Sequence, residues 1–178
     1  MEDSLGNLYP LIVPAEYLQT GICKLPHVPL RASDLILTWV VLHAGQTMVY
    51  VTEAQVEQWK ETGVNLAVVA IENMRRGTGD NPATHEKRDE GGKLQWVAMM
   101  QEDGLGSSRV LLTDNLQALF PEGYSLAIPE RSVGMALSND AASEHKDAFM
   151  LAVQNCHRDG TTPMLGRLLS PTDVTPAL

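Results

Sequence analysis

The sequence predicts an α+β fold, in which a mostly antiparallel sheet of about five strands carries helices packed mainly on one side. The first observation is the continuous apolar, β-branched run of residues 35–44, which is typical of a strand buried on both faces. The second is a pair of strand-like runs, residues 124–130 and 133–138, with a proline at a bend or edge. The third is the helical spacing of apolar residues between and after these runs. A single domain over residues 1–178 is expected, because a chain of this length can bury one sizeable core.

The N-terminal segment, residues 1–33, is predicted to be irregular because its prolines exclude a long helix. Within it, residues 7–13 fit a short edge strand, and residues 14–20 fit a helical turn with a proline at its first position. Residues 48–52 are expected to return along the buried strand 35–44 as a hairpin.

A helix is predicted to begin after Thr52, because Thr52 and Gln55 have the spacing of a capping box. Val56 and Trp59 lie on its inner face, and Gly63 ends it.

A second helix is predicted over residues 64–76, with Gly77 just beyond its end. Its inner stripe consists of apolar residues at helical spacing: Leu66, Val69, Ala70 and Met74. Asn73 lies on the same stripe, so its amide is expected to bond to a neighbouring loop or strand.

Residues 77–92 are polar, rich in glycine and charged with both signs. A segment of this length without periodicity predicts a flexible loop, with a functional lid as the alternative. The tail, residues 170–178, is also expected to be loose.

The stretch "DGLGSSRVLL", residues 103–112, follows a predicted strand and is interpreted as a strand-to-helix junction. Ser107 or Ser108 is expected to cap the helical turn, and Thr113 or Asp114 the next one.

A last long helix is expected after a cap at Asn139 or Asp140. Its core-facing stripe is predicted to contain Phe149, Ala152, Val153 and Cys156.

The composition disfavours several classes of partner. The formal net charge is −9, a sign that repels nucleic acid and anionic membranes, so neither is expected as a partner. The chain shows neither a signal-peptide pattern nor a long apolar run, and its two cysteines, Cys23 and Cys156, are interpreted as reduced thiols. These features favour a cytoplasmic protein.

Familiar catalytic motifs are missing from the sequence, including the phosphate-binding loop, the GxSxG elbow and the HExxH zinc motif. The five histidines are scattered singly along the chain, so neither a metal site nor a cofactor is expected.

Arg109 and Arg131 each interrupt an apolar neighbourhood, and a buried guanidinium needs carboxylates or carbonyls as partners. Structural pairing with Asp103, Asp114 or Glu130 is the favoured interpretation, with ligand binding as the alternative. Because buried polar groups need partners, we also expect Asn73, Arg109 and Arg131 to come together in space.

The order of several short motifs resembles the YtpQ-like family of bacterial proteins, a group without an assigned function. The motifs are "NLYPLIVPAEYL", "DLILTWVVLH" with "MVYVT", "NLAVVAIENM", "DGLGSSRVLL", "LAIPERSVGMAL" and "TPMLGRLL". The resemblance spans nearly the whole chain and marks Asn73, Asp103, Gly104, Ser108, Arg109, Pro129 and Arg131. This chain departs from the family pattern at Ser132, where the family has an aspartate, and at Leu165-Gly166, where it has Leu-Ser.

The sequence therefore favours a non-catalytic domain that binds a protein partner or a small ligand. The alternative is a hydrolase or transferase with Asp103, Ser108, Arg109 and Arg131 around one pocket. A third interpretation is that these residues form a polar network that only holds two loops together.

Overall fold

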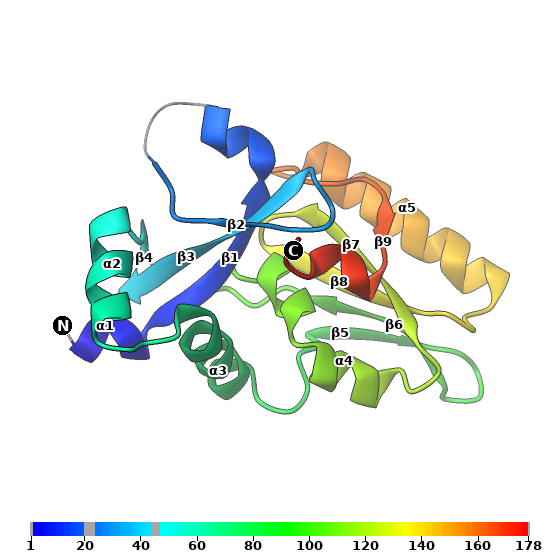
Figure 1. Cartoon of the computed structure of the whole chain (residues 1–178). Coiled ribbons are helices and arrows are strands. Elements are labelled where there is room, and N and C mark those ends of the chain that lie inside the picture. The colour runs from blue at the N-terminus through cyan, green and yellow to red at the C-terminus, as the bar shows by residue number, and fades with distance from the viewer. Residues whose placement is uncertain (1, 20–23, 44–46, 178) are drawn as a thin grey trace. The chain divides into compact units, whose positions relative to one another are not determined.

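A computed structural model describes residues 2–19, 24–43 and 47–177 of the chain. It confirms the α+β class and the antiparallel pairing, with the strands distributed over two sheets (Figure 1). Two compact units are present, residues 1–79 with 176–178 and residues 80–175. That residues 1–178 form a single domain stays a prediction.

The sheet of the first unit is built around β3, whose residues from Leu35 to Val41 are all buried. Its strands, as far as the structure describes the chain, are β1 (Leu8–Pro14), β2 (Val28–Pro29), β3 (Leu35–His43) and β4 (Thr47–Tyr50). β1 pairs antiparallel with β3 from Leu8 opposite Val41 to Pro14 opposite Leu35. β2 and β4 also pair antiparallel with β3. The buried strand and its hairpin partner are thus confirmed, although the turn at residues 44–46 lies outside the described residues.

Four of the described helices belong to the first unit. They are α1 (Glu2–Gly6), the 3-10 helix η1 (Ala15–Gln19), α2 (Glu53–Glu61) and α3 (Leu66–Thr78). The expected edge strand and helical turn of the N-terminal segment are confirmed as β1 and η1, whereas the helix α1 and the short strand β2 were not expected. Side chains from the strands and both longer helices form one core: Leu8, Trp39, Val41, Val51, Val56, Trp59, Leu66 and Ala70.

The capping box of α2 is confirmed, because the N–H of Gln55 donates to Thr52 Oγ1 and the N–H of Thr52 donates to Gln55 Oε1. α3 begins after Asn65, whose side chain accepts the N–H of Val68. α3 runs through Gly77 and ends at Thr78, later than predicted. The chain leaves the helix at Gly79, which has a φ of +76° and donates its N–H to the carbonyl of Arg75.

The second unit contains an antiparallel sheet in the order β5-β6-β8-β7-β9, within the described residues. Its strands are β5 (His85–Arg88), β6 (Leu94–Met99), β7 (Tyr124–Glu130), β8 (Val133–Ser138) and β9 (Leu168–Leu169). Its helices are η2 (Ser107–Leu111), α4 (Thr113–Leu119), α5 (Ser143–Asp159) and η3 (Pro171–Val174). α5 packs on the sheet through Phe149 and Val153, which contact a core that includes Ala127, Met135 and Leu137. Ala152 and Cys156 of the predicted stripe are only partly buried.

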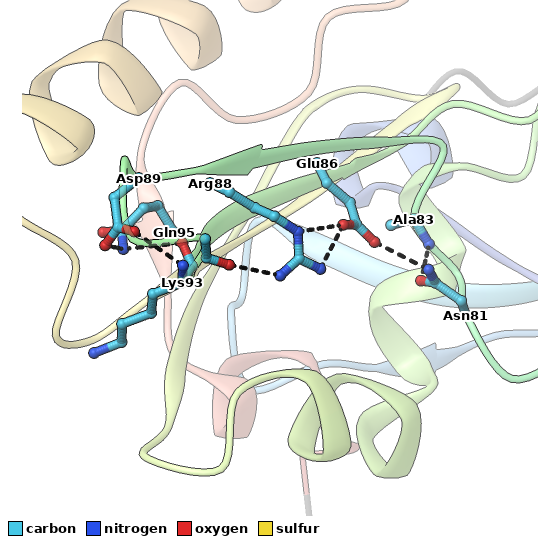
Figure 2. A network of polar contacts seen from close by, with 8 residues as sticks. Asn81, Ala83, Glu86, Arg88, Asp89, Lys93 and Gln95 are labelled. Carbon is cyan, nitrogen blue, oxygen red and sulfur yellow. Dashed lines mark hydrogen bonds and ion pairs between the residues drawn. The ribbon is translucent and has the colours of Figure 1, made fainter.

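The segment 77–92 is not a loop throughout. Its residues 85–88 form β5, which pairs with β6, and a polar network fixes the adjoining turn (Figure 2). Arg88 donates to Glu86 Oε2 and to the carbonyl of Gly92, while Asn81 donates to Glu86 Oε1. The composition of the segment does not indicate this strand, because the strand pairs through its backbone and all its side chains are exposed. Its mobility stays a prediction.

Two expected helix caps are not formed. α4 follows Leu112 and α5 follows Ala142, and neither helix receives a side-chain cap from Thr113, Asp114, Asn139 or Asp140. Asp140 instead accepts from Lys93 and Ser138, 2.7 and 2.9 Å away.

The tail also differs from the expectation, because residues 171–174 form η3 and the N–H of Ser170 donates to Asp173 Oδ2 at 2.7 Å. None of the described helices is both long and apolar enough to cross a membrane.

Candidate functional site

Asp103 and the buried Arg109 form an ion pair in the second unit. The guanidinium of Arg109 donates from both terminal nitrogens to the two carboxylate oxygens of Asp103, at 2.9 and 2.5 Å. Asp103 Oδ1 also accepts the N–H of Leu105 at 3.0 Å. Arg109 is 3 % exposed, whereas Asp103 is half-buried. The pairing of Arg109 with Asp103 predicted from the sequence is confirmed.

The pKa of Asp103 reflects two opposing influences. Burial raises it, but the hydrogen bonds from Arg109 and from the N–H of Leu105 outweigh that effect and hold it below its ordinary value of 3.8. The carboxylate is therefore charged at neutral pH and paired with Arg109, which leaves it poorly suited to act as a general base.

The glycines of this stretch have structural roles. Gly104 has a φ of +72°, a conformation that favours glycine. A Cβ at Gly106 would collide with the backbone oxygens of Ser132 and Met99, so only glycine allows η2 to approach the sheet this closely. The same contact involves Gly134 of β8, where an added Cβ would meet the carbonyl oxygen of Gly106.

Ser107 and Ser108 do not cap η2, which follows Gly106 without a side-chain hydrogen bond. Both serines are fully buried. Ser107 donates its N–H to the carbonyl of Arg131, but its Oγ has no hydrogen-bond partner among the described residues. The prediction of a serine cap is wrong because the sequence places a hydroxyl near a helix start without revealing that it points into the core.

Glu130 holds the turn after β7. Its carboxylate accepts the N–H and the hydroxyl of Ser132 and the N–H of Thr162. The backbone of Arg131 lies in the same turn, donating to the carbonyl of Thr162. Within the described residues, however, the Nε of Arg131 is buried without a partner, so the expected carboxylate pairing is not found.

Asn73 lies in the first unit and is satisfied there. Its Nδ2 donates to the carbonyls of Leu5 and Leu8, at 2.7 and 2.9 Å, and its Oδ1 accepts from Arg76. The predicted bond from Asn73 to a neighbouring loop or strand is confirmed. That Asn73 joins Arg109 and Arg131 in one cluster stays a prediction, because those arginines belong to the other unit.

A pocket of about 880 Å³ lies within the first unit. Its lining comes from the segment before β2, from β3, from α2 and from the start of α3: Leu25, Pro26, His27, Val28, Trp39, Glu53, Val56, Glu57, Lys60, Gly63, Val64, Asn65, Leu66 and Ala67. The volume lies in the range of small-molecule sites, and the lining combines apolar side chains with a few polar groups, as such sites do. The sequence does not reveal this pocket, because its apolar members have the pattern of ordinary core residues.

Some polar groups of the pocket have hydrogen-bond or ion-pair partners, and others do not. Trp39 is 7 % exposed, and its indole Nε1 is buried without a hydrogen-bond partner among the described residues. Lys60 and Glu57 form an exposed ion pair at 2.8 Å. His27 Nδ1 lies 2.8 Å from the carbonyl oxygen of Leu25. The Nε1 of Trp39 is enclosed by protein atoms, so a molecule in the pocket does not reach it.

No group of three or more histidine, cysteine, aspartate or glutamate side chains within the described ranges could hold a metal ion. Cys23 lies outside those ranges, and Cys156 is free and half-buried. Burial, together with the negative charges of Glu130 and Asp159, raises the pKa of the Cys156 thiol, which makes it a poor nucleophile at neutral pH.

Comparison with known proteins identified no relative: no family model matches the chain, and neither a curated protein nor a solved structure matches it.

Proposed function

We propose that this protein is a non-catalytic binding protein whose first unit holds a small, largely apolar ligand. The observation that carries the proposal is the pocket of about 880 Å³ between the segment before β2, β3, α2 and the start of α3. A cavity of this size with an apolar lining and a few polar groups is the arrangement that small-molecule sites share.

The pocket adjoins the core of the first unit, so several of its lining residues are held in place by core packing. Trp39, Val56 and Leu66 belong both to that core and to the pocket lining. The partly buried Val28 and Val64 pack against the same core and also line the pocket. A ligand that covers these side chains would remove further apolar area from water, at about 25 cal/mol for each Å² buried.

The alternative of a hydrolase or transferase around Asp103 and Arg109 has weaker support. A general base or nucleophile must be available to a substrate, whereas Asp103 and Arg109 bind each other. Ser108 is fully buried. These features favour the network that holds two loops together over a reaction centre.

We further propose a cytoplasmic location, on the basis of the acidic composition and the interpretation of the cysteines as reduced thiols. Membership of the YtpQ-like family also remains a proposal, which rests on the order of its short motifs.

The test is the binding of Nile red, a neutral dye that fluoresces in apolar surroundings, to the purified full-length protein. We expect a saturable increase in fluorescence with one dye per chain. Ala67, an exposed residue in the first turn of α3 that lines the pocket, is changed to Trp to fill the pocket mouth. Ala67→Trp is expected to weaken dye binding at least tenfold.

The matched control is Ala54→Trp, because Ala54 is exposed at the equivalent second position of α2 and is not among the lining residues. Ala54→Trp should bind the dye as the wild type does. Dye binding that is not saturable, or that Ala67→Trp leaves unchanged, would overturn the proposal.

A further inference from the structure

We infer that Pro176 and Ala177 act as a strap on the first unit, so that the pairing of this strap with β2 and the occupation of the pocket stabilise each other. The inference rests on the proposed function, because it assigns a means of regulation to the same pocket. It follows from the position of β2, which contributes to the pocket lining and also pairs with the strap.

The segment that contains β2 forms one part of the pocket lining, through Leu25, Pro26, His27 and Val28. This segment is joined to β3 by a short pairing. β2 pairs with β3 over only two residues, Val28 and Pro29, and the hydroxyl of Thr38 donates to the carbonyl of Pro26 at 2.8 Å. A short pairing has low local stability, so further contacts of β2 help to fix this part of the lining.

The strap supplies such a contact on the second edge of β2. The N–H of Leu30 donates to the carbonyl of Leu35, towards β3. Because backbone groups alternate in direction along a strand, the carbonyl of Pro29 points to the opposite edge. There it accepts the N–H of Ala177 at 2.8 Å, and Leu30 forms an antiparallel bridge with Pro176. β2 therefore lies between β3 and the strap.

The strap is held mainly through its backbone. Pro176 and Ala177 are both exposed, so their side chains add little burial to the attachment, and it can open without unfolding of the core. Both residues belong to the first unit, as the whole pocket lining does.

Val28 connects the strap to the pocket. Its side chain packs against the core of the first unit and lines the pocket, while its neighbour Pro29 accepts the hydrogen bond from Ala177. A ligand that contacts Val28 restrains the same short segment that the strap restrains. Two events that order one segment favour each other, and this coupling is reciprocal.

The first test measures amide hydrogen exchange of the full chain by nuclear magnetic resonance, with and without saturating Nile red. We expect the dye to slow exchange of the Ala177 amide at least threefold, although Ala177 is not among the lining residues. The amide of Gly123, which donates to the carbonyl of Phe120 in the second unit, is the control and should keep its rate.

The second test uses two variants of one exposed residue. Ala177→Pro removes the N–H that donates to Pro29, and we expect the dissociation constant of Nile red to rise at least threefold. Ala177→Ser is the matched control, because it keeps the N–H at the same position, and it should bind the dye as the wild type does.

The outcomes separate the two proposals. If Nile red binds and Ala67→Trp blocks it, but Ala177→Pro leaves the dissociation constant unchanged, the pocket binds ligands and the strap inference is wrong. The inference is also wrong if Ala177→Pro and Ala177→Ser weaken binding equally, or if the dye slows exchange at Ala177 and Gly123 equally. If dye binding is not saturable, or if Ala67→Trp leaves it unchanged, the proposed function and this inference both fail.

Discussion

Gly106 is tightly constrained where the backbone of η2 meets the sheet. Gly106 lies against the backbone oxygens of Ser132 and Met99, which cannot move aside as a flexible side chain could. The glycine-rich stretch at residues 103–112 therefore includes a packing contact between backbones. The ion pair of Asp103 and Arg109 lies beside it and holds the preceding turn.

Gly106→Ala should lower the free energy of unfolding by about 3 kcal/mol, the upper end of the cost of overpacking. Chemical denaturation measures this value. Gly6→Ala is the control, because an added Cβ at Gly6 meets no atom within 4 Å. Equal stabilities of the two variants would contradict the packing role of Gly106.

Asp103 should make the stability of the fold depend on pH in the acidic range. Its pKa in the folded protein is lowered, so its ionised form stabilises the fold above the ordinary value of 3.8, and this contribution disappears as the pH falls through the lowered pKa. Urea unfolding between pH 2 and 7 should show a steeper loss of stability below pH 4 in the wild type than in Asp103→Asn. Parallel curves would show that the ion pair does not stabilise the fold.

At the scale of elements, the long periodic patterns predicted the structure well. The sequence predicts the buried strand β3, the pair β7 and β8 and the capped helix α2. Buried strands appear in a sequence as apolar runs, and a capping box appears as polar residues at a fixed spacing. β5 is not predicted, because an exposed edge strand keeps its side chains in water and takes its stability from backbone pairing.

The helix caps show that a short sequence pattern does not always predict the structure. Thr52 caps α2 through its hydroxyl, whereas Ser107 places a similar hydroxyl in the core without a partner. Thr52→Ala should therefore cost about 1 kcal/mol of unfolding free energy. Ser107→Ala should cost close to nothing, because it removes a buried hydroxyl that forms no hydrogen bond with the described residues. A larger loss in Ser107→Ala than in Thr52→Ala, measured by thermal unfolding, would contradict this assignment.

The turn between β5 and β6 depends on Gly92, whose φ is +84°. Gly92→Ala should strain this turn by about 1–2 kcal/mol, since a residue with a Cβ is disfavoured in the left-handed region. Trypsin should then cleave after Lys87 and Arg88 faster than in the wild type. Gly91→Ala is the control, because Gly91 does not have a positive φ and an added Cβ would come near only a side-chain end, Asp89 Oδ1 at 3.3 Å. Rapid cleavage of the wild type at both sites would instead support a flexible loop.

At the scale of the whole molecule, the chain contains two compact units, and the pocket belongs entirely to the first. The sequence could not predict this pocket, because its lining is spread over residues 25–67 and converges only when the sheet and both helices have formed. Arg109 and Arg131 could be recognised in the sequence because each is a charged residue within an apolar neighbourhood. Asp103 and Arg109 are indeed joined, but their contacts favour a structural role.

The central claim is that the pocket of the first unit binds a small ligand. It is tested most directly by nuclear magnetic resonance, with the ¹⁵N-labelled full chain titrated with Nile red. The chain has three tryptophans, and each indole N–H gives a separate signal. We predict a saturable shift of the Trp39 indole and of the amides of Leu66 and Ala67, with the Trp96 indole unchanged. Shifts confined to residues 80–175, or no saturable shift at all, would contradict the claim.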